Sequence, residues 1–138
     1  MKPSLLRIMD ANYNRTKEAL RVVEDFARFF LNDARLSAAF KRARHDLTRA
    51  LLRFPVSYRK LVAARDSAND IGRDRWIQDG QRRRPGWKEV MIANQKRAQE
   101  GLRVMEEVSK IIAPAQSPAF QRLRFKLYEL EKDSFRKF

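Results

Sequence analysis

The sequence comprises 138 residues, and its 31 lysine or arginine side chains outnumber its 17 aspartate or glutamate side chains, which gives a formal net charge of +14. Hydrophobic residues make up 43% of the chain, enough for one folded domain with a core. The chain has no cysteine and one histidine, His45, which excludes disulfides, thiolate nucleophiles, cysteine-ligated zinc and histidine-rich metal sites.

The positive charge favours anionic partners such as nucleic acid, anionic lipid or small phosphorylated molecules. Most of this charge comes from arginine, whose planar guanidinium group suits phosphates and carboxylates but also internal ion pairs. No apolar run is long enough to span a bilayer, and the N-terminal segment has no signal-peptide core. We therefore expect a soluble cytoplasmic protein without a membrane partner.

Apolar side chains recur at three- and four-residue spacing over most of the chain, as is typical of amphipathic helices. This spacing predicts helices at about 4–31, 34–53, 56–64, 87–112 and 118–136. Residues 65–86 are rich in turn formers and are expected to be irregular. No segment shows the alternation of a β-strand, so the predicted fold is all-α.

The chain contains an internal repeat. Ala11–Asp25 aligns with Ala93–Glu107, and eight of the fifteen positions are identical. Phe40, Arg44 and Leu47 likewise match Phe120, Arg124 and Leu127, which lie eighty residues later. The repeat predicts one helical domain, 1–138, built as a pseudo-two-fold four-helix bundle. The first hairpin occupies about 4–53, the linker about 54–86 and the second hairpin about 87–138.

Each hairpin is expected to bring one amide and two guanidinium groups to its core side. These are Asn12, Arg15 and Arg44 in the first copy, and Asn94, Arg97 and Arg124 in the second. A functional interpretation is a polar cleft between the hairpins that takes an anionic ligand. A structural interpretation pairs Arg15 with Glu18 and Arg97 with Glu100, while the amides bond to the backbone or to each other.

Other polar groups carry further alternatives. Arg21 and Arg103, with Glu24 and Glu106, are expected to form a solvated face. His45, which becomes Phe125 in the second copy, is either a pH-active group next to Arg44 or an ordinary surface histidine.

The linker contains Arg65, Asp66, Asp70 and Gly72 within eight residues. Two carboxylates four residues apart suit Mg²⁺ bound together with phosphate oxygens, although carboxylates in turns are also common as caps. The cluster Arg82-Arg83-Arg84 is either a phosphate clamp or a solvated loop.

These motifs together resemble a small bacterial helical family that is often fused ahead of thiamine-phosphate synthase. The resemblance rests on Asp10-Ala11-Asn12 with Arg15, on Arg44-His45, on Arg65-Asp66 with Asp70-Ile71-Gly72, and on the second copy from Ala93 to Glu107. It covers nearly the whole chain, but the loop Arg73–Arg84 is longer and more basic than is typical of the family. The resemblance implies a hydroxymethylpyrimidine-phosphate kinase, which uses ATP to convert the monophosphate to the diphosphate.

Under this hypothesis Asp66 and Asp70 are the catalytic pair and hold Mg²⁺. Phosphates bind to four arginines, Arg15, Arg44, Arg97 and Arg124, and Asn12 and Asn94 read the aminopyrimidine or orient oxygens. His45 and Arg65 complete the substrate-binding set.

Thiamine-phosphate synthase, fused or separate, is the implied partner. One alternative is a noncatalytic accessory domain that docks on this enzyme, and a weaker one is a basic nucleic-acid-binding protein. Phe135 and Phe138 are candidates to cover a partner or a second subunit.

Overall fold

The computed structural model describes residues 2–74 and 83–138, and the regular elements in these ranges are all helical. They are α1 (Pro3–Asp25), a π-helical turn (Phe26–Phe30), α2 (Ala34–Leu52), α3 (Tyr58–Ala64), α5 (Trp87–Ile112), a 3₁₀ turn (Pro114–Gln116) and α6 (Ser117–Phe135). The all-α prediction is confirmed. The predicted helices begin and end within two residues of the observed ones once the π-helical turn is counted with α1.

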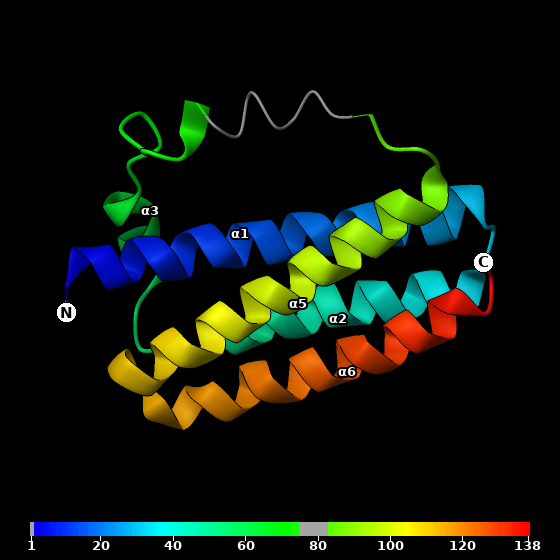
Figure 1. Cartoon of the computed structure of the whole chain (residues 1–138). Coiled ribbons are helices and arrows are strands. Elements are labelled where there is room, and N and C mark those ends of the chain that lie inside the picture. The colour runs from blue at the N-terminus through cyan, green and yellow to red at the C-terminus, as the bar shows by residue number, and fades with distance from the viewer. Residues whose placement is uncertain (1, 75–82) are drawn as a thin grey trace.

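The four long helices form a bundle in which α1 packs against α2 and α5, and α6 packs against the same two helices. Figure 1 shows that α1 and α2 run antiparallel as one hairpin, and that α5 and α6 form the second. The helix α3 lies near the N-terminal end of α1, whereas α5 begins at the opposite end of the bundle. The bundle therefore has an α1–α5 face and an α2–α6 face.

The core is built from equivalent positions of the two hairpins. Phe40 and Phe120 are repeat equivalents, and both are almost completely buried. Ile8 and Phe30 belong to the apolar spacing of the first predicted helix but are exposed, by 40% and 57%. Phe30 lies at the end of the bundle, where its ring packs against the ring of Trp87 with a distance of 5.2 Å between the ring centroids. The apolar periodicity predicts which side of the helix faces the core. It does not show that the bundle ends at Phe30, which leaves this side chain exposed.

The turn between α1 and α2 depends on two polar residues. Asn32 has a φ of 54°, a left-handed conformation that asparagine tolerates better than most residues. Asp33 then caps α2, because its side chain accepts a hydrogen bond of 2.9 Å from the backbone N–H of Leu36. Its carboxylate also pairs with Lys137 at 3.2 Å, which fastens the C-terminal segment to this turn.

The Asp33 cap makes stability depend on pH. The hydrogen bond from the Leu36 N–H, followed by the pairing with Lys137, lowers the pKa of Asp33 despite its partial burial. A lowered folded-state pKa stabilises the fold above the unfolded-state pKa of about 3.9, and this stabilisation is lost as the pH falls below it. We expect Asp33→Asn to lower the unfolding free energy by about 1 kcal/mol at pH 7 and by less at pH 3. Urea unfolding of both proteins at the two pH values measures this, and an equal difference at both would contradict it.

The crossing of α1 and α5 depends on a small residue. A Cβ atom at Gly101 would overlap with the Thr16 hydroxyl and would lie 3.2 Å from the backbone oxygen of Asn12. The repeat equivalents of Thr16 and Gly101 are Ala98 and Ala19, which are both buried. Small residues therefore occupy both symmetry-related positions between α1 and α5. One position has Thr16 with Gly101, and the other has Ala19 with Ala98.

This contact predicts a stability effect with a built-in rescue. We expect Gly101→Ala to lower the unfolding free energy by about 1–3 kcal/mol, because the β-branched Thr16 cannot turn away without strain. The double variant Thr16→Ala/Gly101→Ala should recover most of this loss, since it removes the hydroxyl that the new methyl meets. Thermal and urea unfolding measure both changes. A double variant no more stable than the single one would show that the overlap is not the cause.

Candidate active site

Two adjoining cavities lie along α1 and share Asn12 and Arg15 as lining residues. The first, of about 410 Å³, lies between the N-terminal half of α1 and the segment that follows α3. Its polar lining includes Arg7, Asn12, Arg15, Arg65, Asp66 and Asp70. The second, of about 300 Å³, lies between α1 and α5 and is lined by Asn12, Arg15, Arg97, Glu100, Gly101 and Val104. We call the two together the α1 groove.

Arg15 lies where the two cavities meet. Its side chain is exposed, and no hydrogen bond or ion pair joins it to another of the described residues, Glu18 included. Arg97, its repeat equivalent, lines the second cavity from α5. Arg7 lines the first cavity, and its guanidinium donates a 3.4 Å hydrogen bond to the backbone oxygen of Asp66. The groove thus presents arginines from two helices to an incoming anion.

The two repeated asparagines behave alike locally but occupy different surroundings. The side-chain amide of Asn12 donates to the backbone oxygen of Ile8 at 2.9 Å, and that of Asn94 donates to Val90 at 2.8 Å. Asn12 is buried and lines both cavities, whereas Asn94 is half-buried and is not among their lining residues. The groove therefore uses one asparagine of the pair, which corrects the expectation that both face it.

Arg65 is held by the carboxylate of Asp10, a motif residue to which the sequence assigned no role. Its Nε and Nη2 donate to the two carboxylate oxygens of buried Asp10 at 2.7 and 2.9 Å. The hydrogen bond to Asp10 raises the pKa of Arg65, with a smaller effect from Tyr58. This bidentate pair fastens the segment after α3 onto α1. Arg65 therefore builds the wall of the first cavity, and much of its hydrogen-bonding capacity is already used.

Asp66 and Asp70 line the same cavity and also stabilise the turn between them. A carboxylate oxygen of Asp66 accepts from the backbone N–H of Asn69 at 3.3 Å, and Asp70 accepts from the N–H of Gly72 at 3.0 Å. Both interpretations of these residues, as turn caps and as cavity carboxylates, are thus compatible with the geometry. Two hard oxygen donors on one cavity wall are a donor set that suits Mg²⁺.

The described part of the chain contains no group of three or more histidine and acidic side chains placed to hold a metal ion. A cation at Asp66 and Asp70 would therefore need further oxygens from water or from a bound phosphate. This is the usual arrangement for Mg²⁺ in phosphoryl-transfer sites.

Arg44 and Arg124, one in the second helix of each hairpin, line neither of these two cavities. Arg44 Nε donates to Glu24 at 2.8 Å, and the Nε and Nη2 of Arg124 donate to Glu106 at 3.0 and 2.8 Å. Glu24 and Glu106 are 5% and 3% exposed, so both pairs lie within the bundle. Arg44 and Arg124, which were expected to bind phosphates, are thus engaged by carboxylates, and the expectation that the two glutamates lie on a solvated face is wrong.

Arg124 has a further partner that Arg44 lacks. Its Nη1 donates to the Tyr128 hydroxyl at 2.8 Å, and this bond together with the Glu106 carboxylate raises the pKa of Arg124. Arg21 and Arg103 are exposed as expected, and each forms ion pairs within its own helix. The guanidinium groups of Arg44 and Arg124 are therefore engaged in ion pairs within the bundle.

Two further sequence candidates lie away from the groove. His45 is exposed on α2 and lines neither of the two cavities. Arg83 and Arg84 are exposed, and Arg82 lies outside the described residues. Arg7, in contrast, was not predicted to belong to the site. Its spacing of eight residues from Arg15, about two helical turns along one face, is the signal that could have indicated it.

Residues 7–133 match the sequence model of the ThiD2 family. Three relatives are each called thiamine-phosphate synthase. The protein of Nostoc punctiforme is 39% identical over 127 residues, that of Thermosynechococcus vestitus 40% over 128, and that of Rhodopirellula baltica 35% over 126. The alignments cover 91–93% of this chain but only 32–34% of these relatives. The chain thus spans about one third of their length. No solved structure matches it.

None of the helices in the described ranges is long and apolar enough to cross a membrane.

Proposed function

Because the chain belongs to the ThiD2 family, we propose that it acts in thiamine biosynthesis as an ATP-dependent kinase of hydroxymethylpyrimidine monophosphate. The observation that carries this proposal is the α1 groove, where Arg15 has no acidic partner among the described residues and faces the same cavity as Asp66 and Asp70. Arginines close to a carboxylate pair provide the two elements that phosphoryl transfer requires, namely cationic groups for phosphate oxygens and oxygen ligands for Mg²⁺.

In the proposed reaction a phosphate oxygen of the acceptor forms a bond to the γ-phosphorus of ATP, and the bond from this phosphorus to the β–γ bridging oxygen breaks, which releases ADP. Arg7, Arg15 and Arg97 bind the non-bridging oxygens and orient the two phosphates in line. The buried amide of Asn12 contacts the pyrimidine or a phosphate oxygen. A phosphate monoester has its second pKa at about 6, so the acceptor is largely ionised near pH 7 and needs no strong general base.

Asp66 and Asp70 would hold Mg²⁺, which neutralises the charge that develops on the phosphate oxygens. Arg65 acts as a positioning residue in this proposal, since its pairing with Asp10 holds the segment that carries both aspartates.

The reaction is tested with the purified chain, ATP, Mg²⁺ and the pyrimidine monophosphate by an enzyme-linked assay for ADP. We expect ADP and the pyrimidine diphosphate in equal amounts. The unphosphorylated pyrimidine alcohol should give none, because it offers no phosphate oxygens to Arg15. Thermal stabilisation by the monophosphate without ADP release would contradict the kinase proposal and favour the second candidate.

That second candidate is a noncatalytic domain that binds the pyrimidine phosphate for thiamine-phosphate synthase. It is favoured by the relatives, which are named for that enzyme and are about three times as long as the matched region. A nucleic-acid-binding role, which the net charge of +14 suggests, predicts instead stabilisation by an oligonucleotide that declines steeply with salt.

A variant of the carboxylate pair tests the Mg²⁺ ligands. We expect Asp70→Asn to abolish Mg²⁺-dependent ADP release and to leave the far-ultraviolet circular dichroism of the helices unchanged. Asp70 is exposed, and its Oδ1 accepts a hydrogen bond from the backbone N–H of Gly72. The side-chain oxygen of asparagine can accept the same hydrogen bond. Asp74→Asn is the matched control, since Asp74 is also exposed but does not line the first cavity. Unaltered turnover in Asp70→Asn would remove Asp70 from the metal role.

A further inference from the structure

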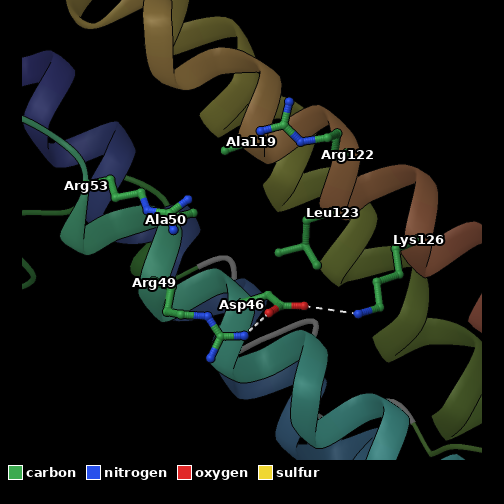
Figure 2. Close-up of a pocket in the computed structure, with 8 residues that line it drawn as sticks. All are labelled: Asp46, Arg49, Ala50, Arg53, Ala119, Arg122, Leu123 and Lys126. Carbon is green, nitrogen blue, oxygen red and sulfur yellow. Dashed lines mark hydrogen bonds and ion pairs between the residues drawn. The ribbon is translucent and has the colours of Figure 1, made fainter.

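A second groove lies on the α2–α6 face of the bundle, away from the α1 groove. It has a volume of about 310 Å³ and is lined by side chains of both helices (Figure 2). Its charged lining residues are Asp46 and Arg49 of α2, Arg53 at the C-cap of α2, and Arg122 and Lys126 of α6. Leu123 and two alanines form its apolar part. The proposed kinase reaction uses none of these residues.

The charge in this groove is strongly unbalanced. Asp46 accepts a 3.0 Å hydrogen bond from Lys126 and pairs with Arg49, so one carboxylate serves two cations from opposite helices. Burial raises the pKa of Asp46, but the hydrogen bonds from Lys126 and Arg49 outweigh this and lower it, so Asp46 stays ionised. Arg53 and Arg122 have no acidic partner among the described residues. Four cations against one carboxylate leave an excess of three positive charges.

The repeat shows that this imbalance does not follow from the duplicated scaffold. Eighty residues separate equivalent positions of α2 and α6, and the equivalents of Arg49 and Arg53 are Glu129 and Asp133. By the repeat, the symmetry-related half of the interface therefore combines Arg42 and Lys126 with Asp46, Glu129 and Asp133. One half carries an excess of cations and the other a slight excess of acids. A generally basic surface would not separate the charges in this way.

We propose that the α2–α6 groove binds the phosphate groups of a small molecule that carries at least two linked phosphates. Arg53 and Arg122 approach from the two helices and are free to bind oxygens, while Asp46 holds Arg49 and Lys126 in place beside them (Figure 2). A guanidinium group binds one phosphate through parallel hydrogen bonds, so two such groups in one groove favour two linked phosphates over a single small anion. This is a binding site separate from the α1 groove, and it does not depend on the kinase proposal.

The test maps binding of inorganic diphosphate by amide chemical shifts in two-dimensional NMR spectra of the full chain. We expect diphosphate to shift the amides around Asp46–Arg53 and Ala119–Lys126, whereas sodium chloride at equal ionic strength does not. The double variant Arg53→Gln/Arg122→Gln should weaken binding at these amides at least about tenfold. The control Arg42→Gln/Lys132→Gln removes the same charge from exposed positions on the same two helices outside this groove, and it should bind as the unmodified chain does.

The readout also separates this proposal from the proposed function. Shifts around Arg15 report on the α1 groove, so their loss or persistence does not bear on the α2–α6 groove. The α2–α6 proposal is overturned if diphosphate leaves the Asp46–Arg53 and Ala119–Lys126 amides unchanged. It is also overturned if the control variant weakens binding as much as the groove variant, since binding would then follow net charge alone.

Discussion

Arg15→Gln is expected to lower kcat/KM for phosphorylation of the pyrimidine monophosphate by at least about a hundredfold, with little change in stability. Arg15 is exposed, lies where the two cavities of the α1 groove meet, and has no partner among the described residues, so its removal leaves no buried charge unpaired. Its guanidinium is thus available for phosphate oxygens, and the loss of a preorganised cation raises the barrier when negative charge is redistributed in the transition state.

Steady-state kinetics with ATP and monophosphate varied separately measure this effect. Arg42→Gln is the matched control, because it removes an exposed arginine outside the groove and should keep full activity. Arg15→Lys should recover only part of the rate, since an ammonium group does not reproduce the bidentate geometry of arginine. Kinetics of Arg15→Gln that match those of the control would place the reaction outside the α1 groove.

Glu106→Ala is expected to lower the unfolding free energy by about 3–5 kcal/mol, the usual cost of removing one partner of a buried ion pair. Glu106 is 3% exposed and accepts both the Nε and the Nη2 of Arg124, whose side chain is only 10% exposed. Without Glu106, the Tyr128 hydroxyl is the one hydrogen-bond partner that the Arg124 guanidinium keeps among the described residues, and the penalty for its desolvation is no longer offset.

Urea unfolding at pH 7 measures the loss, with Glu107→Ala as the control. Glu107 is the next residue, is 46% exposed and pairs with Arg103 and Lys110 on the surface, so its removal should cost much less than the removal of Glu106. The double variant Glu106→Leu/Arg124→Leu should recover most of the stability, because it removes both charges together. Equal losses in the two single variants would show that the buried pair adds nothing beyond a surface ion pair.

The sequence alone determined the helices and their pairing into two hairpins. Apolar spacing of three and four residues reflects which face of a helix turns inward, so the helix boundaries could be predicted closely from local signals. The identity between Ala11–Asp25 and Ala93–Glu107 further indicated two equivalent hairpins. The sequence also indicated five residues that line the first cavity, Asn12, Arg15, Arg65, Asp66 and Asp70.

Only the tertiary structure decided which arginines are available to a ligand. Arg15 and Arg44 both border the apolar face of their own helices, but Arg44 meets Glu24 of α1 whereas Arg15 meets a cavity. Helical periodicity indicates on which face of its own helix a residue lies. It does not indicate which side chain of a neighbouring helix that residue meets. The pair of Asp10 with Arg65, which builds the wall of the first cavity, joins residues 55 positions apart. Such a contact follows from how the segment after α3 packs on α1, which no local spacing encodes.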